Sequence, residues 1–382
     1  LYTLLVPDRA STLFPCFDQP DIKGHYVLDI TAPKDWEVLW GSNIELKEAE
    51  GDFVRHKFKQ SDRMSTYLFS FVAGKFNKVN QKLGDLNMHM LYRENNEEKL
   101  AASIPEIFKL HDKSVLFLED YTKYKFPFQK LDFAVIPGFQ YGGMEHVGAI
   151  QYREASLFLD DNATQSQKLN RSRLIAHETA HMWFGDLVTM KWFDDVWLKE
   201  VFANFLADKV TRQSFPEVNH YLNFMTDHYG SAYSVDRTQG STPIKQPLDN
   251  LKNAGTLYGR IIYDKAPIMM RQLEALVGEV SFRKGMQNYI KSYADDNADW
   301  DDLVTLLDAE TSEDLKQWSA VWVNKSGRPV ISNAITYKND KIESFEISQK
   351  AEDGSDNVWP QTFEVGLVYK DSVEVMPIKL NA

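Results

Sequence analysis

Two histidines and two glutamates carry most of the chemical information in this sequence. His177, Glu178 and His181 form the pattern H-E-x-x-H within an apolar helical run, and Glu200 follows in the next such run. Residues four apart on an α-helix project from nearly the same face, so both imidazoles can reach one metal ion. Glu178 would then lie beside that ion without binding it, where a general base acts on a metal-bound water.

Glu200 is the candidate for a third ligand. Zinc in a catalytic site takes three protein ligands and leaves a fourth position for water. A helix that returns antiparallel to the first would bring the Glu200 carboxylate back to the two imidazoles. Another interpretation is a salt-bridged amphipathic helix whose histidines are satisfied by hydrogen bonds. Against it, burying these groups costs several kcal/mol unless a cation compensates, and the flanking residues are apolar: Leu174, Ile175, Ala176, Met182, Trp183 and Phe184.

Composition excludes several other classes of protein. The formal net charge is −12 and basic residues do not cluster, so a nucleic-acid partner is disfavoured. No apolar run reaches the roughly 18 residues that a transmembrane helix needs. Cys16 is the single cysteine, which excludes an intramolecular disulfide and a thiolate metal cluster. Its neighbours Phe14 and Phe17 predict a buried thiol.

The hydrophobic pattern changes twice along the chain. Alternation typical of strands runs through residues 1–92, helical spacing dominates residues 95–323, and alternation returns after about residue 326. The pattern predicts an α+β multidomain protein with a β domain over residues 1–94, a mainly helical domain over residues 95–325 and a second β unit over residues 326–382. Two or three strands make a poor independent domain, so we expect the last unit to be partial.

The block HETAHMWFGDLVTMKWFDDVWLKEVFANF closely resembles the M1 family of zinc aminopeptidases, which are gluzincins of the aminopeptidase N type with the pattern H-E-x-x-H-x18-E. The resemblance implies a thermolysin-like catalytic domain and one Zn²⁺ per chain, held by His177, His181 and Glu200. It also implies that Glu178 is the general base and proton shuttle. Val201 departs from the glycine that commonly follows the third ligand in the family.

A second match is YGGMEHVGAIQYRE, residues 141–154, which resembles the G-x-M-E-N exopeptidase motif of the family. On its own, a Gly-Gly pair followed by a glutamate predicts only a turn. The resemblance implies that the Glu145 carboxylate pairs with the free α-amine of a substrate. It further implies substrate contacts from the neighbouring residues Gly142, Gly143, Met144 and His146, the last of which replaces the asparagine of the family.

The segment IIYDKAPIMMRQLEALVG resembles the Y-x-K-G segment of the family. Tyr263 would then donate a hydrogen bond to the oxyanion that forms during peptide hydrolysis. Without the resemblance, a tyrosine on an apolar helix face is a core residue. Tyr258 ranks second because no Asp-Lys follows it, and Pro267 is expected to bend or start a helix.

The two ends of the chain also carry family signatures. RASTLFPCFDQP resembles the N-terminal-domain signature, which implies that residue 1 falls inside that domain and that the sequence is a piece of a longer protein. VWVNKSGRPVISNAITY resembles the entry to the β-sandwich domain of the family. Leu4 and Val6 stand where many members carry a glutamine and a glutamate that hold the substrate amine, so amine recognition would rest more on Glu145.

Together these matches imply a metalloaminopeptidase that hydrolyses the N-terminal residue from peptides with a free N-terminus. One alternative is an epoxide hydrolase of the leukotriene A4 hydrolase type, which shares the zinc scaffold. Another is a catalytically weak or non-enzymatic M1-like scaffold. Such relatives usually lose zinc ligands, whereas all three candidate ligands are present here.

Overall fold

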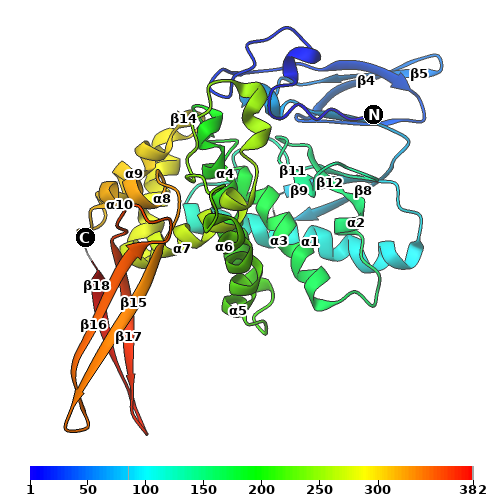
Figure 1. The fold of residues 1–382 in the computed structure, drawn as a ribbon. Coiled ribbons are helices and arrows are strands. Elements are labelled where there is room, and N and C mark those ends of the chain that lie inside the picture. The colour runs from blue at the N-terminus through cyan, green and yellow to red at the C-terminus, as the bar shows by residue number, and fades with distance from the viewer. Residues whose placement is uncertain (85, 381–382) are drawn as a thin grey trace.

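Three regions follow one another along the chain in the computed structural model, which describes residues 1–84 and 86–380 (Figure 1). A β-rich region lies at the N-terminus, a helical body follows, and two long hairpins project from the body near the C-terminus. This order of elements confirms the α+β architecture predicted from the hydrophobic pattern.

The N-terminal region is antiparallel throughout. Its strands form one three-stranded sheet in the order β2-β5-β4 and two pairs, β1-β6 and β3-β7. A small core of its own contains Trp40, Phe58 and Phe69. The strand bounds are β1 Lys23–Gly24, β2 Asp29–Pro33, β3 Glu37–Trp40, β4 Ile44–Glu50, β5 Phe53–Phe58, β6 Met64–Ser65 and β7 Phe71–Gly74.

The prediction for Cys16 was wrong. The thiol is only partly buried, and the neighbouring Phe17 side chain is 77% exposed. Both residues lie in an irregular loop between a short 3₁₀ turn, Ala10–Thr12, and β1. Apolar neighbours in sequence do not by themselves bury a thiol: Phe14 and Cys16 pack at the margin of the small N-terminal core, whereas Phe17 is exposed.

A five-stranded mixed sheet links the N-terminal region to the helical body. Its order is β11-β12-β10-β9-β8, with β10 parallel to both of its neighbours and β11 antiparallel at the edge. Strand β9 precedes residue 94 and β10 follows it, so the sheet joins strands from both sides of the predicted domain division, which stays a prediction. The bounds are β8 Asn77–Leu83, β9 Leu86–Tyr92, β10 Phe133–Ile136, β11 Gly143–Met144 and β12 Ile150–Arg153.

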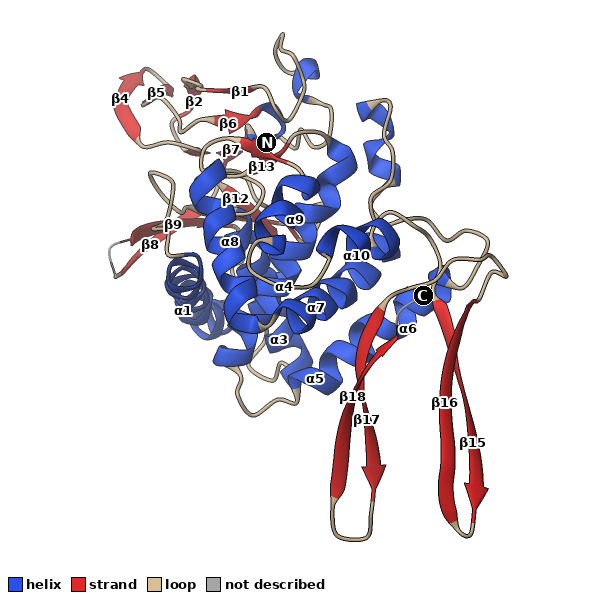
Figure 2. Cartoon of the chain, turned by 90° about the vertical axis from the view of Figure 1, so that its left-hand side faces the viewer, coloured by secondary structure: helices blue, strands red, loops and turns tan. Residues whose placement is uncertain are grey.

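The three longest helices of the body are α1 Glu97–Thr122, α3 Gln165–His181 and α4 Val196–Ser214, and α3 packs against both of the others. Figure 2 shows α3 and α4 in the middle of the body and α1 at its left margin. Helix α3 begins with a capping box, in which Thr164 and Gln167 satisfy each other's backbone N–H groups. It ends at His181, and the chain turns away at Gly185, whose φ is +135°. The other helices are α2 Glu154–Leu157, α5 His220–Phe224, α6 Gly230–Asp236, α7 Ala266–Val277, α8 Glu279–Tyr293, α9 Trp300–Asp308 and α10 Leu315–Trp322, and a two-residue parallel bridge pairs β13 Thr189–Met190 with β14 Asn297–Ala298.

Two antiparallel hairpins complete the described chain. They are β15 Pro329–Lys338 with β16 Lys341–Ala351, and β17 Gln361–Val368 with β18 Val373–Leu380. The hairpins lie side by side and extend away from the helices (Figures 1 and 2). Among the described residues, Ala351 at the base of the first hairpin and the nearby Trp359 belong to the main core.

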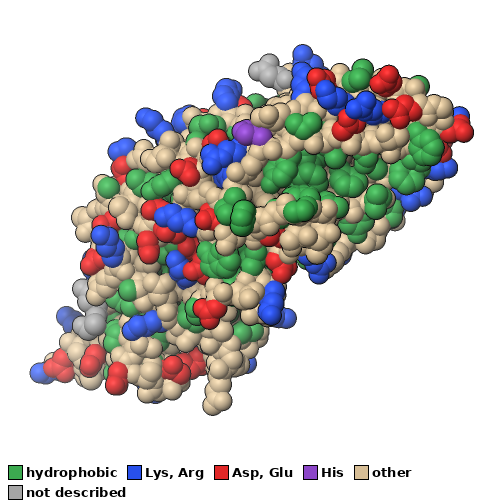
Figure 3. Space-filling view, turned by 90° about the horizontal axis from the view of Figure 1, so that it is seen from above, with side chains coloured by type: hydrophobic (Ala, Val, Ile, Leu, Met, Phe, Trp, Pro, Cys, Tyr) green, Lys and Arg blue, Asp and Glu red, His purple; other side chains and the backbone are tan. Residues whose placement is uncertain are grey.

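The molecular surface carries both signs of charge. On the face seen in Figure 3, Lys and Arg side chains are interspersed with Asp and Glu, and hydrophobic side chains gather beside them. Exposed hydrophobic residues of the N-terminal region include Phe17, Val27, Leu46 and Phe53. Among the helices of the described residues, none combines the length and the apolarity that a bilayer crossing requires.

Asp195 fixes the start of helix α4. Its carboxylate accepts hydrogen bonds from Trp197 Nε1 at 3.2 Å, Lys245 Nζ at 3.0 Å and the backbone N of Trp300 at 3.3 Å. Burial raises the pKa of Asp195, and the Lys245 ammonium opposes that shift. This one buried side chain therefore ties α4 to the start of α9 and to the loop that carries Lys245.

Replacing Asp195 by alanine should lower the free energy of unfolding by about 3 kcal/mol, because it leaves the Lys245 ammonium and two N–H donors without their acceptor. Urea unfolding measures the change. Asp194→Ala is the matched control, since Asp194 is the adjacent, partly exposed carboxylate, and it should shift stability by no more than about 0.5 kcal/mol. Equal effects of the two variants would contradict the assigned role.

Candidate active site

Helices α3 and α4 pack against each other and run antiparallel. Ser172 Oγ lies 3.5 Å from Thr211 Oγ1 at one end of the pair, and His177 Nδ1 lies 2.9 Å from Asn204 Oδ1 nearer the other. This geometry fulfils the expectation that a returning helix would bring Glu200 back toward the two histidines.

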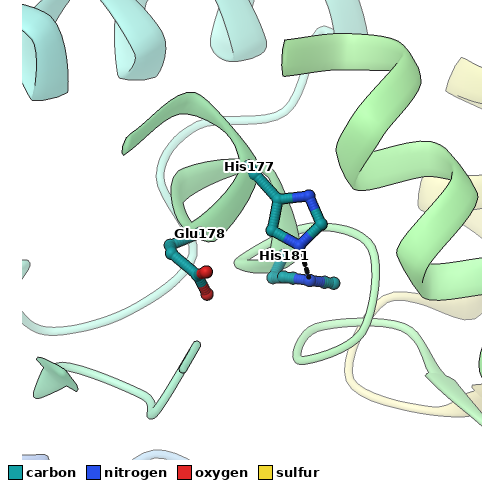
Figure 4. Close-up of side chains that lie close together, drawn as sticks. All are labelled: His177, Glu178 and His181. Carbon is teal, nitrogen blue, oxygen red and sulfur yellow. Dashed lines mark hydrogen bonds between the residues drawn. The ribbon is translucent and has the colours of Figure 1, made fainter. Parts of the chain in front are cut away.

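The three candidate ligands point at one another. His177 Nε2 and His181 Nε2 lie 3.0 Å apart (Figure 4). Glu200 Oε2 lies 3.4 Å from His177 Nε2 and 3.8 Å from His181 Nε2. Two imidazole nitrogens and one carboxylate oxygen therefore converge from two helices, and this is a donor set that zinc accepts.

The hydrogen bonds of the two Nδ1 atoms indicate that the Nε2 atoms of both rings face inward. His177 Nδ1 faces Asn204 Oδ1 at 2.9 Å, and His181 Nδ1 faces the carbonyl oxygen of Phe184 at 3.0 Å. Because both of these oxygens only accept hydrogen bonds, each Nδ1 carries the proton and each neutral ring turns an Nε2 lone pair inward. Two lone pairs and a carboxylate that meet at this distance need a cation between them, supplied either by a proton or by a metal ion.

The pKa shifts separate the groups that stay neutral from those that carry charge. Burial lowers the pKa of His181 to about 4. At His177, burial is outweighed by Glu200 and Glu178, so the pKa is raised. Burial would raise the pKa of Glu200, yet Lys199 and the two histidines hold it well below its usual range. The cluster thus keeps the Glu200 carboxylate ionised and the His181 ring neutral, which are the forms that bind a metal ion.

Glu178 projects from α3 to one side of the two imidazoles (Figure 4). Its carboxylate packs against the backbone of β11, where a Cβ atom added to Gly143 would lie 2.3 Å from Glu178 Oε1. A side chain at position 143 would displace this carboxylate, which explains the glycine. Burial, together with Glu145 and Glu200, raises the pKa of Glu178 to about 8. A carboxylate of that basicity can take up and release a proton near neutral pH.

Glu145 follows directly after β11 and is buried. Its carboxylate forms an ion pair with Lys199 Nζ, which also lies 2.9 Å from Glu200 Oε1. Burial would raise the pKa of Glu145, but Lys199 and His181 outweigh it and lower the pKa to about 2. The sequence reasoning missed Lys199, although a lysine inside the apolar run VWLKEVF was a signal. It also missed Asn204, four residues after Glu200 on the same helix.

One cavity of about 610 Å³ connects these groups. Helices α3 and α4 form part of its lining, as do Val6 and Pro7 of the N-terminal region and residues 141–145. Val6, but not Leu4, is among the lining residues, so an apolar side chain borders the cavity at a position discussed for amine recognition. Gly142, Gly143, Met144 and Glu145 all line the cavity, as their predicted substrate contacts require.

The structure places the other predicted site residues, His146 and Tyr263, in different surroundings. His146 is fully buried, does not line the cavity, and has no hydrogen-bond partner on either ring nitrogen within the described residues. Tyr263 lines the cavity from a π-helical turn, Ile261–Lys265, and Pro267 lies in the first turn of the following α7. Tyr258 lines it too, with its ring centroid 6.3 Å from that of Tyr263. The structure therefore keeps both tyrosines as candidates.

Comparisons with known proteins agree with this picture. Residues 107–322 match the model of the peptidase family M1 domain, and residues 2–68 match the peptidase M1 N-terminal domain. The chain is 32% identical to "Probable aminopeptidase 1" of Sulfurisphaera tokodaii, over 99% of this chain and 49% of that protein.

Two further relatives carry similar names. "Leucyl aminopeptidase" of Saccharolobus solfataricus is 30% identical over 89% of this chain and 43% of that protein. "Aminopeptidase M1-C" of Oryza sativa subsp. japonica is 30% identical over 97% of this chain and 42% of that protein. The chain thus spans half or less of the length of these relatives.

Replacing Asn204 by alanine should weaken zinc binding by about tenfold or more, because the acceptor that orients His177 is lost. Competition with a chelator on the purified protein measures this affinity. Asn170→Ala is the control, because Asn170 lines the same cavity two turns before His177 on α3. This variant should leave the zinc affinity unchanged. An Asn204 variant that binds zinc as tightly as this control would show that the contact does not orient a ligand.

Proposed function

The chain belongs to peptidase family M1, and on that premise we propose that it is a zinc-dependent aminopeptidase, which releases the N-terminal residue from peptides. One observation carries the proposal: His177, His181 and Glu200 converge in a cavity that Glu178 and Glu145 also line. The names of the relatives support the same activity.

In this proposal His177, His181 and Glu200 hold one zinc ion per chain. When bound, zinc would supply a Lewis acid that lowers the pKa of water and polarises the substrate carbonyl. The neutral Nε2 atoms and the ionised carboxylate suit that ion, because their outer atoms are already bound to Asn204, to the Phe184 carbonyl and to Lys199.

Glu178 moves the proton. Its carboxylate accepts a proton from the attacking water as the water oxygen bonds to the carbonyl carbon of the first peptide bond. It then delivers that proton to the peptide nitrogen as the C–N bond breaks, so one carboxylate serves as base and then as acid. Burial of Glu178 raises its pKa, which keeps the protonated form accessible between the two transfers.

Tyr263 and Glu145 bind the two ends of the reacting residue. The Tyr263 hydroxyl donates a hydrogen bond to the carbonyl oxygen as that oxygen gains negative charge. Glu145 accepts hydrogen bonds from the α-ammonium of the substrate. Because Glu145 is fixed close to the histidines, a substrate whose α-ammonium binds there presents its first peptide bond for cleavage. This distinguishes the proposed enzyme from an endopeptidase.

The two alternatives are less well supported. A lipid epoxide has no amine for Glu145 to bind, so the buried carboxylate in the cavity favours peptides over an epoxide substrate. A scaffold without activity has no need of a complete ligand set, and here all three candidate ligands converge.

Glu178→Gln should retain zinc and lower kcat on aminoacyl anilides by about 10²- to 10⁴-fold, because the amide cannot take up a proton. The unsubstituted protein, assayed with and without a chelator, is the control and should lose activity when zinc is removed. Near-native turnover by the Glu178→Gln variant, or full activity of the unsubstituted protein in the chelator, would contradict the proposed mechanism.

Tyr263→Phe should lower kcat by about 10²-fold or more, the usual effect of losing one oxyanion donor. Tyr258→Phe should have a much smaller effect. The pair is well matched because both rings line the cavity and lie beside each other. If Tyr258→Phe gave the larger loss, the oxyanion donor would have to be reassigned to Tyr258.

A further inference from the structure

Lys199 joins two carboxylates that the proposed function uses separately. Its ammonium forms ion pairs with Glu145 Oε1 and with Glu200 Oε1, the latter at 2.9 Å. The side chains of Lys199, Glu145 and Glu200 are only 4%, 4% and 7% exposed. With so little solvent to screen them, these charges interact more strongly than a surface ion pair does.

The contact with Lys199 determines which oxygen of Glu200 faces the histidines. Because Oε1 is held by the ammonium, Oε2 is the oxygen that lies 3.4 Å from His177 Nε2 and 3.8 Å from His181 Nε2. A buried carboxylate without this contact would be free to rotate about its last bonds. Lys199 therefore gives Glu200 one defined orientation toward the metal site.

Lys199 is itself firmly placed. Its alkyl chain packs over Gly185, where an added Cβ would lie 3.3 Å from Lys199 Cδ. Its ammonium lies 5.8 Å from the centroid of the Tyr67 ring, and the Tyr67 hydroxyl donates a hydrogen bond to the Gly185 carbonyl oxygen at 3.3 Å. The alkyl chain of Lys199 is thus held against the backbone turn that follows α3, and its ammonium lies beside the Tyr67 ring.

Lys199 also prevents repulsion between the two acids. Donor atoms of Glu145, His181 and Glu200 all lie within 4.8 Å of one another, so two carboxylate charges would face each other directly without a cation between them. The ammonium offsets that repulsion and keeps both carboxylates at this spacing.

We propose that Lys199 is a positioning residue for zinc binding, which orients Glu200 as a ligand and fixes Glu145 to the same charge cluster. The inference rests on the proposed function, because it takes Glu200 as a zinc ligand. It adds that Glu145, proposed to bind the substrate amine, and Glu200, proposed to bind the metal, are held in place by the same Lys199 ammonium.

The test is the zinc affinity of Lys199→Met, measured by competition with a chelator on the full purified chain. Methionine keeps most of the side-chain volume and removes the charge. We expect zinc affinity to fall by about 10- to 100-fold, as for the loss of other groups that orient a metal ligand. With cobalt(II) in place of zinc, the visible absorption spectrum should also change, because the Glu200 oxygen is no longer held.

Lys265→Met is the matched control. Lys265 is equally buried and pairs with Asp236, with side-chain exposures of 5% and 4%, but it contacts none of the candidate ligands. This variant should lose stability while keeping its zinc affinity and its cobalt spectrum. An equal loss of zinc affinity in both variants would overturn the proposal, because it would reflect only the removal of a buried charge.

A double variant keeps the test decisive if Lys199→Met does not fold. Lys199→Met combined with Glu145→Gln removes one charge of each sign, so two unpaired carboxylates no longer face each other. We expect it to fold and to show the same loss of zinc affinity. If either variant folds and binds zinc as tightly as the unsubstituted chain, Lys199 does not position Glu200. If the unsubstituted chain itself binds no zinc, the proposed function fails first.

Discussion

Charged and titratable groups lie buried where two antiparallel helices meet, and the surrounding fold has to satisfy them there. His177, His181, Glu178 and Glu200 are all largely withdrawn from water within an apolar body. Such a cluster is stable only if its charges balance and its hydrogen bonds are satisfied. Asn204, Lys199 and the Phe184 carbonyl satisfy the outer atoms, while the inner atoms are left facing one another. A cation is therefore needed between the two Nε2 atoms and Glu200 Oε2, and this is where a metal ion would bind.

The surrounding elements fix the positions of the side chains in this site. The capping box starts α3 at a defined residue, and the helix ends at His181, before the chain turns away at Gly185. Asp195 fixes the start of α4, five residues before Glu200. Strand β11, at the edge of the mixed sheet, brings a glycine against Glu178 and leads into Glu145. Each contact removes freedom from one functional side chain, which is how a site gains the precision that catalysis needs.

Features of the site that depend on spacing along one helix could be predicted from the sequence, whereas those that depend on contacts between helices could not. The convergence of His177 and His181 follows from helical spacing alone, and helix geometry with the coordination chemistry of zinc also placed Glu178 and Glu200. The roles of Glu145 and Tyr263 came from resemblance to family motifs. Lys199 and Asn204 were missed because their roles arise from contacts across helices, which sequence spacing does not specify. For the same reason the sequence expected a substrate contact from His146, which the structure buries away from the cavity lining. The choice between Tyr263 and Tyr258 stays a prediction, since both rings reach the cavity.

In the proposed site a metal ion, and not a proton on His177, supplies the positive charge between the two imidazoles. X-ray absorption at the zinc edge, combined with elemental analysis of the purified chain, tests it most directly. We expect about one zinc per chain, with two nitrogen ligands and at least one oxygen ligand at about 2.0–2.2 Å. A chain that remains metal-free in excess zinc, with a proton shared between His177 and Glu200, would contradict it.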